Sequence, residues 1–403
     1  MKTYSFETAD FIESTSWVLQ NSNISNQDIL ISYKKSISKV RMSYRDRTVF
    51  FESIANNVII EDSEDNDDDT GVIAINSLML SRFVKVVPKK APTVVLEEHY
   101  NTNGQLAYLI ARAGNLKANI PCYTAKRYAK PQVTTVAQLP PNNFFPSLSL
   151  AGSATNNAVK EEQSIFTTVD LSLKNDKIVI FGTDSFVMNL SKAPIKIINE
   201  EFYDKKAKND HFLIASHFSN LKTLTSVSKN DESIEIIVGN SSQKTIGFKF
   251  ENNYSCLFTC INIDPLTMAE KVFDNSEKSI THVFPIEIKK FKDGVKNIIS
   301  LSPETESINV SIRPDHLVIS DKDSQNSLTI PIENIKKVNG DNDDDFSVQN
   351  ISFSHLVINK MFNTIGNNDC LIHFANSNNG KTVFITYGDD INKSKIVTAL
   401  YTK

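Results

Sequence analysis

The chain has 403 residues, of which 40% are hydrophobic and 9% aromatic, and a formal net charge of −4. This length exceeds one ordinary core and fits two or three globular domains. No apolar run approaches the roughly 18 to 20 residues that a membrane helix needs, and acidic residues stand where a signal peptide has its apolar run. We therefore expect a cytoplasmic protein with no membrane partner.

The first third of the chain alternates helical and strand patterns, identified by apolar spacing of three to four or of two residues. In order, these are a helix at residues 8–21, a strand at 37–46, an acidic loop at 61–69, a helix at 77–85 and strands at 94–97 and 107–111.

The middle third repeats this order with one weak element. Its first helix, expected at residues 140–158, contains Pro141, Pro146 and Gly152, which disfavour helix. The other patterns are a strand at 175–184, a polar loop at 204–210, a helix at 216–224 and strands at 234–237 and 245–250.

The last third shows the same order again. Its patterns are a helix at residues 286–301, a strand at 314–323, an acidic loop at 341–345, a helix at 354–362 and strands at 371–374 and 382–386.

Two independent series have the same period. The strand-like runs end in Asp46, Asp184 and Asp323, which are 138 and 139 residues apart. The second helices open with Ser77, Ser216 and Ser354, which are 139 and 138 residues apart and which can cap a helix or lie in its first turn. The pattern predicts three copies of one α+β unit of about 138 residues, with three unrelated domains as the alternative.

Short motifs accompany this organisation, namely Gln138-Leu-Pro, Phe181-Gly-Thr-Asp184 and Ile263-Asp-Pro265. With them, the chain resembles the bacterial beta-type sliding clamp of DNA polymerase III over essentially its whole length. The family's turn usually reads Thr-Asp-Gly-His-Arg-Leu, whereas this chain has Thr183-Asp-Ser-Phe-Val-Met188. The asparagine-, lysine- and isoleucine-rich composition is compatible with a phage or a divergent bacterium.

The resemblance implies an α+β fold of three tandem repeats of a two-helix, antiparallel-sheet clamp domain, at residues 1–130, 131–276 and 277–403. Two chains would close head to tail into a ring, with helices lining the hole. The implied function is a DNA sliding clamp, a processivity factor that encircles double-stranded DNA and tethers a DNA polymerase after opening by a clamp loader. The alternative is a clamp-like interaction scaffold that is not loaded on DNA.

The charge distribution supports a DNA-encircling ring. The acidic loops at residues 61–69 and 341–345 hold eleven acids; we interpret them as solvated loops, with calcium loops as the alternative. The six segments proposed to line the hole sum to +6, which leaves −10 elsewhere, and a basic lining suits sequence-independent phosphate contacts. The residues expected to face DNA are Arg82, Lys85, Lys89, Lys90, Lys222, Lys289, Lys292, Lys296 and Lys360.

Carried over by position, the resemblance also implies two protein-binding sites. The partner-peptide pocket would comprise Phe166, Thr183, Ser185, Phe186, Val187, Met188, Pro265, Leu266, Ala269, Ala399, Leu400 and Tyr401. In the dimer interface, an edge strand at residues 116–123 would pair with the third unit of the other chain, with contacts from Ile120, Cys122, Ile298, Ile299 and Leu301. The alternative for residues 397–401 is that they complete the last sheet.

Enzymatic motifs are missing from the sequence. It contains no glycine-rich phosphate loop, no His-x-x-x-His and no Gly-x-Ser-x-Gly. The four cysteines are too few and too scattered for a disulfide framework or a zinc site. We interpret the seven dispersed histidines as structural or exposed, and we expect no catalysis, no metal and no cofactor.

Overall fold

The computed structural model describes residues 1–20, 28–62, 69–129, 131–155, 165–174, 176–216, 218, 221, 224, 233–251, 253–278, 280–286, 288–313, 315–332, 336–337, 349–365, 370–377, 380–387 and 394–399. By internal contacts the chain forms two compact units. Unit 1 comprises residues 1–141, 198–202 and 219–260, and unit 2 comprises residues 142–197, 203–218 and 261–403.

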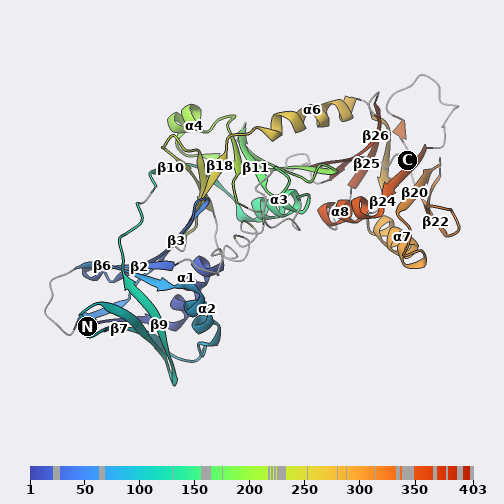
Figure 1. The fold of residues 1–403 in the computed structure, drawn as a ribbon. Helices are drawn as coiled ribbons and strands as arrows, with labels where there is room; N and C mark the ends of the chain where they lie inside the picture. The colour runs from blue at the N-terminus through green and yellow to red at the C-terminus, as the bar shows by residue number, and fades with distance from the viewer. Residues whose placement is uncertain are drawn as a thin grey trace. The chain divides into compact units, whose positions relative to one another are not determined.

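The first and third series share one order of helices and strands, and the second repeats their order of strands (Figure 1). The second series has the additional helix α4, and its expected second helix, residues 216–224, lies largely outside the described residues. The first series is β1 (Lys2–Glu7), α1 (Thr8–Gln20), β2 (Asp28–Lys34), η1 (Lys35–Ile37), β3 (Lys39–Arg45), β4 (Val49–Ala55), β5 (Ile59–Asp62), β6 (Thr70–Asn76), α2 (Ser77–Val86), β7 (Thr93–Tyr100), β8 (Leu106–Ala113) and β9 (Leu116–Thr124). The second is β10 (Val133–Leu139), α3 (Pro141–Ser153), β11 (Val169–Lys174), β12 (Lys177–Thr183), β13 (Val187–Pro194), β14 (Lys196–Ile197), α4 (Glu200–Lys206), β15 (His211–Ile214), β16 (Ile234–Gly239), β17 (Thr245–Lys249) and β18 (Tyr254–Ile261).

The third series is preceded by α6 (Pro265–Lys278). It comprises β19 (Ile280–Ile286), α7 (Ile288–Leu301), β20 (Ser307–Ile312), β21 (His316–Asp321), β22 (Ser327–Pro331), β23 (Lys336–Lys337), β24 (Gln349–Ser354), α8 (His355–Ile365), β25 (Cys370–Ser377), β26 (Gly380–Tyr387) and β27 (Ser394–Ala399). The strands expected after each second helix are therefore confirmed in all three series.

Unit 1 contains two antiparallel sheets. One has the order β5-β1-β7-β8-β9. The other begins with β9-β6-β2-β3-β4 and continues through β18-β17-β16-β10. The junction of β4 with β18, where Phe51 pairs with Cys256, joins strands of the first and second series into one sheet.

Unit 2 repeats this construction. Its large sheet has the order β15-β11-β12-β13, then β27-β26-β25-β19, and the junction is β13 with β27, where Met188 pairs with Val397. A separate sheet has the order β24-β20-β21-β22. Residues up to Ala399 therefore do complete a sheet, as the alternative interpretation of the C-terminal segment held.

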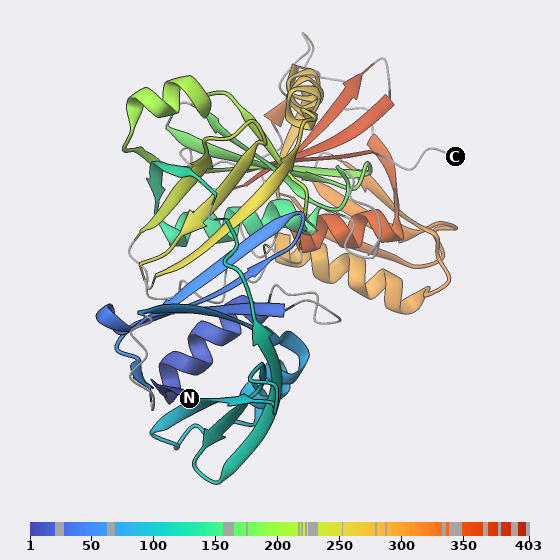
Figure 2. The ribbon, with the colours of Figure 1, turned by 60° about the vertical axis from the view of Figure 1, so that its left-hand side comes forward.

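The two helices of the first series pack through aromatic rings, and so do the two helices of the third series. The centroids of Phe11 in α1 and Phe83 in α2 lie 6.3 Å apart, and those of Phe291 in α7 and Phe362 in α8 lie 5.2 Å apart. Figure 2 shows the ribbons of α7 and α8 side by side. The single tryptophan, Trp17 in α1, is 1% exposed and contacts Phe51, Phe250 and Tyr254. Such aromatic contacts add to the energy of area burial.

The first helix of the middle series is present where it was expected, although its sequence pattern is weak. Residues 141–153 form the regular helix α3 although Pro146 lies inside it. Pro141 occupies the first helical position, where proline is tolerated, and Phe144, Leu148 and Ala151 are fully buried at helical spacing. Tertiary packing of this apolar face outweighs the helix-breaking tendency of proline.

Membrane helices are not found in the part of the chain that the structure describes: no helix there is both long and apolar enough to span a bilayer.

Candidate nucleic-acid interface and partner site

The basic residues of the first series lie on the exposed side of α2 and in the turn after it. Asn76 caps the helix, since its Oδ1 accepts a hydrogen bond from the Met79 N–H at 3.0 Å. Leu80 and Phe83 are buried, whereas Arg82 and Lys85 are exposed. Lys89 and Lys90 are exposed in the following turn. The helix therefore presents its basic residues to solvent because its apolar stripe faces the core.

Helix α7 has the same arrangement. Phe291, Val295 and Ile298 belong to the core of unit 2. Lys289 and Lys296 are exposed, and Lys292 is half-buried.

The remaining two predicted DNA-facing residues differ from these. Lys360 in α8 forms an ion pair with Asp184 at 2.5 Å, and its side chain is 22% exposed. The charge of Lys360 is thus already compensated within the chain. Lys222 lies outside the described residues.

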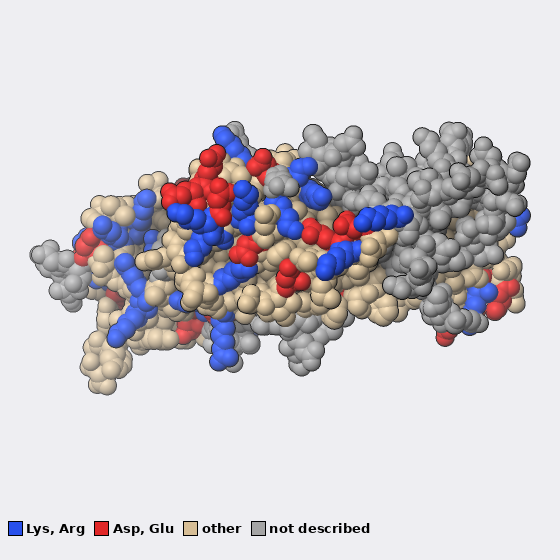
Figure 3. All heavy atoms as spheres, turned by 90° about the horizontal axis from the view of Figure 1, so that it is seen from above, with Lys and Arg blue, Asp and Glu red and all other residues tan. Residues whose placement is uncertain are grey.

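Charged side chains elsewhere are mixed in sign. On the face seen in Figure 3, basic and acidic residues intermingle among the side chains drawn in colour, which gives no extended field of one sign. Residues 74–90, by contrast, hold four basic residues and no acidic one. Of the acidic loops, residues 63–68 and 341–345 lie outside the described part of the chain.

The Thr-Asp turn joins β12 to β13 and is held by the side chains of its first two residues. Asp184 Oδ1 accepts hydrogen bonds from the N–H groups of Phe186 at 2.9 Å and Val187 at 2.8 Å. Thr183 Oγ1 accepts from the Ser185 N–H at 3.0 Å. Ser185 has a φ of 80°, a left-handed conformation that favours the glycine of the family's turn.

Equivalent turns occur in the other two series. Asp46 Oδ1 accepts from the N–H groups of Thr48 and Val49. In the third series the aspartate with this role is Asp321, which accepts from the Gln325 and Asn326 N–H groups. The residue equivalent to Asp46 and Asp184 is therefore Asp321, and the sequence-based choice of Asp323 is wrong by two residues.

The predicted partner-pocket residues fall into two groups. One group is buried and consists of Val187, Pro265, Leu266 and Ala269. Val187 and Met188 lie on opposite faces of β13. Val187 packs against the core formed with α7 and α8, and Met188 packs against the core beneath α6. Thr183 is 5% exposed. The residues accessible to a partner are Phe166, 38% exposed, and Phe186, 59% exposed, together with Ser185. Ala399 ends β27, and Leu400 and Tyr401 lie outside the described residues.

Most of the predicted dimer-contact residues are internal to their own chain. Ile120, Cys122 and Ile298 are at most 6% exposed, and Ile299 packs against the core of unit 2. Burial raises the pKa of the Cys122 thiol to about 12. Leu301, at the end of α7, is 65% exposed. Of these five residues, Leu301 is thus the one placed to contact another chain.

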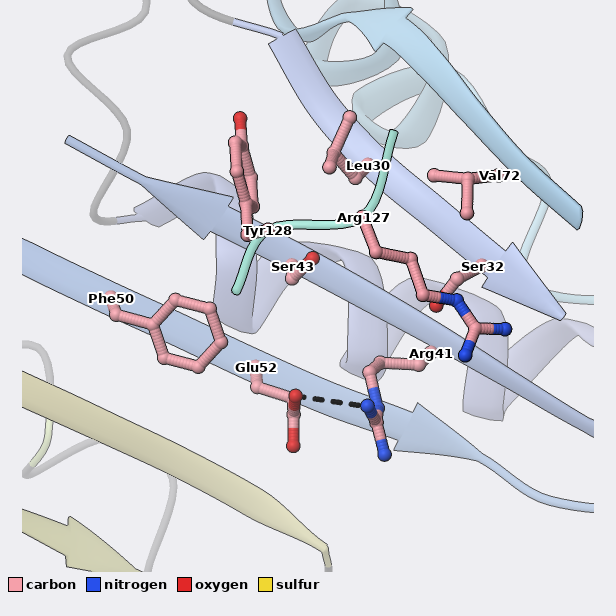
Figure 4. Close-up of a pocket in the computed structure, with 9 residues that line it drawn as sticks. All are labelled: Leu30, Ser32, Arg41, Ser43, Phe50, Glu52, Val72, Arg127 and Tyr128. Atoms are coloured by element: carbon pink, nitrogen blue, oxygen red, sulfur yellow. Dashed lines mark ion pairs between the residues drawn. The ribbon is translucent and has the colours of Figure 1, made fainter. Parts of the chain in front are cut away.

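A small pocket in the second sheet of unit 1 is lined by two arginines that the sequence patterns did not single out. Figure 4 shows Arg41, Arg127 and Glu52 around it, with Arg41 Nε 3.3 Å from Glu52 Oε2. Its volume of about 20 Å³ is that of a water-sized cavity. The pocket is therefore too small for a ligand.

One polar cluster was missed because its members are far apart in sequence. Asp170, His211 and Asp264 come together in unit 2, and among the described residues they form the one group of three or more His, Cys, Asp or Glu able to hold a metal ion. Single-sequence patterns place each of them in a different element, so no spacing motif connects them.

The three-fold recurrence of elements and the sheet-joining strand pairs define the architecture of the DNA sliding clamps of the bacterial beta type. Comparison with solved structures agrees: this chain is similar over 100% of its length to the Bacillus subtilis DNA polymerase sliding clamp, with 99% of that chain covered, a TM-score of 0.74 and 16% identity. It is also similar to the DNA polymerase III beta subunit of Thermotoga maritima, with both chains fully covered, a TM-score of 0.75 and 11% identity. A third similar structure is the Pseudomonas aeruginosa DnaN sliding clamp bound to griselimycin, with both chains fully covered, a TM-score of 0.73 and 10% identity. No family model and no curated protein sequence matches this chain. The chain therefore has the beta sliding clamp fold with a highly divergent sequence.

Proposed function

We propose that this protein is a non-enzymatic DNA sliding clamp that encircles double-stranded DNA as a homodimer and tethers a DNA polymerase. The observation that carries the proposal is the sliding-clamp fold over the whole chain, combined with basic residues on the exposed sides of α2 and α7. Phosphate contacts from such residues hold DNA without reading its sequence, so they are compatible with sliding.

Ring closure is supported by strand edges at the two ends of the repeat. Each series contains three consecutive antiparallel strands: β2-β3-β4, β11-β12-β13 and β20-β21-β22. Inside the chain, the third of these strands pairs with the last strand of the next series, β4 with β18 and β13 with β27. The corresponding edges that have no partner among the described strands are β22 and the residue 116–121 part of β9. We propose that β22 of one chain pairs with β9 of the other, because a contact of this kind closes head to tail and leaves no open edge. The domain boundaries then fall near residues 131 and 277.

Topology of the DNA tests the function directly. Dimers dissociated by dilution are allowed to reassociate in the presence of nicked circular or linear plasmid, and the bound protein is measured by gel filtration. A ring around DNA is retained on the circle and released when a restriction enzyme linearises it. Equal retention on both forms, or on neither, would support an interaction scaffold instead of a clamp.

The DNA-facing residues are tested by a charge reversal with a matched control. Lys85, Lys89 and Lys90 changed together to Glu should weaken retention at least about tenfold, since affinity depends steeply on the number of phosphate contacts. The control changes Lys34, Lys35 and Lys39, exposed residues around the β2–β3 hairpin, to Glu and makes the same change in net charge. Equal loss in both variants would show that net charge, not a lining, determines retention.

The dimer contact is tested at Leu301, because Ile299 packs into the core and its replacement would also disturb the fold. Leu301→Lys should yield monomers of 45.1 kDa in sedimentation or light scattering. Leu356→Lys, at an equally apolar residue that is 79% exposed on α8, should leave the dimer intact. A dimer that survives Leu301→Lys would place the interface elsewhere.

We propose the surface around Phe186 and Phe166 as the partner site, because large exposed apolar side chains can receive the apolar anchors of an extended peptide. Griselimycin, bound by the P. aeruginosa clamp, is a usable probe. Phe186→Asp and a chain lacking residues 400–403 should each lose griselimycin binding in calorimetry, whereas Leu356→Asp should keep it. Unchanged binding in both test variants would move the site.

A further inference from the structure

Three elements of unit 2 bring a histidine and two aspartates together. Asp170 lies on β11, His211 opens β15 and Asp264 directly precedes α6. Ser172 pairs with His211 across the two strands, so Asp170, Ser172 and His211 share one face of the sheet. His211 Nδ1 lies 3.3 Å from Asp170 Oδ2 and 3.4 Å from Asp264 Oδ1.

The face of β11 in this cluster has polar atoms that lack partners. Asp170 and Ser172 are fully buried and Thr168 is 3% exposed. Thr168 Oγ1, Asp170 Oδ1 and Ser172 Oγ have no hydrogen-bond partner among the described residues. Asp170 and Ser172 alternate along β11 and therefore point to the same side of the strand, whereas Thr168 directly precedes β11. A buried polar atom without a partner is destabilising, so unpartnered Asp170 Oδ1 and Ser172 Oγ on one face of β11 indicate a site built to receive a ligand.

The geometry of the histidine suits a metal ion better than a proton. A single Nδ1 proton can be donated to one carboxylate at a time, and charge-assisted bonds of this kind are usually about 2.7 to 2.9 Å long. The observed distances are longer and nearly equal. In a tetrahedral zinc site with bonds of about 2.1 Å, neighbouring ligand atoms are about 3.4 Å apart.

We propose that Asp170, His211 and Asp264 form a binding site for one divalent transition-metal ion of the Zn²⁺ class. The imidazole nitrogen favours Zn²⁺ and similar ions over Mg²⁺ and Ca²⁺, which prefer oxygen ligands alone. With His211 neutral, the two carboxylates supply two negative charges to the cation. Lys174, the nearby cation on β11, is itself held by Glu270 at 3.0 Å.

Access and coordination are provided by Asp264. Its side chain is 44% exposed, so the site opens to solvent on this side and water can complete the coordination. Asp264 Oδ1 also accepts the Thr267 N–H at 2.9 Å and so caps α6. Metal binding would join β11, β15 and α6 at one ion.

The probe is Co²⁺ and then Zn²⁺, added to the tag-free full-length chain after removal of metals with a chelator. Tetrahedral Co²⁺ should give visible d–d absorption that saturates at one ion per chain, and Zn²⁺ should displace it. Absence of saturable binding, or binding of Mg²⁺ and Ca²⁺ with no preference for Zn²⁺, overturns the proposal.

Variants locate the binding. Asp264→Asn retains the cap, since Asn and Asp are equivalent at this position, and should therefore fold while losing a ligand. Loss of a residue that only hydrogen-bonds a metal ligand weakens metal affinity about 10- to 100-fold. Loss of a ligand itself, in Asp264→Asn or His211→Gln, should therefore weaken Zn²⁺ binding at least about tenfold. The matched control is His316→Gln. His316 Nδ1 lies 2.6 Å from the Asp315 carboxylate, and among the described residues this pair belongs to no cluster that could hold a metal ion, so its loss should leave Zn²⁺ affinity unchanged. Equal Zn²⁺ affinity in all variants, or equal loss in His316→Gln, contradicts the assignment.

Discussion

Asp184 holds the Thr-Asp turn in two separable ways, and replacing it tests both. Asp184→Ala removes the two backbone hydrogen bonds and the ion pair with Lys360. Asp184→Asn keeps an Oδ1 acceptor for the Phe186 and Val187 N–H groups but removes the charge. The difference in unfolding free energy between the two variants therefore gives the contribution of the two backbone hydrogen bonds. The effect of Asp184→Asn gives the contribution of the ion pair and of the negative charge that strengthens those hydrogen bonds.

The expected magnitudes follow from these contacts. Hydrogen bonds to a charged group contribute about 1.5 to 3 kcal/mol and neutral ones about 1, and an ion pair near the surface contributes up to about 1. Since Lys360 and Asp184 are 22% and 14% exposed, we expect Asp184→Asn to cost about 1 to 2 kcal/mol and Asp184→Ala about 3 to 4.

Urea unfolding followed by circular dichroism gives the free energies, and hydrogen exchange of residues 185–190 shows whether the loss is local. The matched control is Asp46, which holds the equivalent turn and has no ion pair among the described residues. Asp46→Asn should therefore cost less than Asp184→Asn. If Asp184→Asn and Asp184→Ala are equally unstable, the side-chain hydrogen bonds do not hold the turn and the reasoning fails.

Three further predictions concern single positions. Ser185→Gly should raise stability by about 0.5 to 1 kcal/mol in urea unfolding, because relief of about 1 to 2 kcal/mol of left-handed strain exceeds the added unfolded-state entropy of glycine; a loss of stability would mean that the Ser185 side chain matters. Gly152→Ala should destabilise by about 1 to 3 kcal/mol despite the better helix propensity of alanine, since its Cβ would lie 1.8 Å from the buried Phe218 ring, and an unchanged melting temperature would contradict this packing. The raised pKa of Cys122 contributes stability that is fully present below the ordinary thiol value of 9.0 and is lost as the pH rises to about 12. Cys122→Ser should flatten the decline of the melting temperature in that range.

The sequence predicted the repeat and most elements well because their apolar spacing is regular. The strands of residues 94–97 and 371–374 and the helix of residues 286–301 agree with β7, β25 and α7 to within a few residues. The helix expected at residues 140–158 is present as α3, where packing of Phe144 and Leu148 outweighs the weak local preference. The pattern failed at Asp323, because the aspartate that accepts the backbone hydrogen bonds of the turn in the third series is Asp321.

For the site, sequence predicted exposure better than contact. Lys85 on α2 and Lys289 and Lys296 on α7 are exposed, and Lys292 is half-buried, because helical periodicity determines which side of a helix is buried. The burial of Ile120 and Cys122 within their own chain could not be predicted from the sequence. Strand alternation shows that both side chains lie on one face of β9, but it does not show whether the same chain or another chain covers that face. The ion pair of Lys360 with Asp184 and the Asp170 cluster depend on contacts between distant segments, which no local pattern encodes.

Trp17 makes unit 1 separately observable by spectroscopy. It is the single tryptophan of the chain, and it stacks on Tyr254 and contacts Phe250, both from the second series, while its Nε1–H donates to the Glu52 carbonyl at 3.0 Å. Its emission will therefore respond to the opening of the β4–β18 junction and be silent to events confined to unit 2. An unfolding curve recorded by fluorescence, laid over one recorded by circular dichroism, will show whether the two units melt together or one after the other.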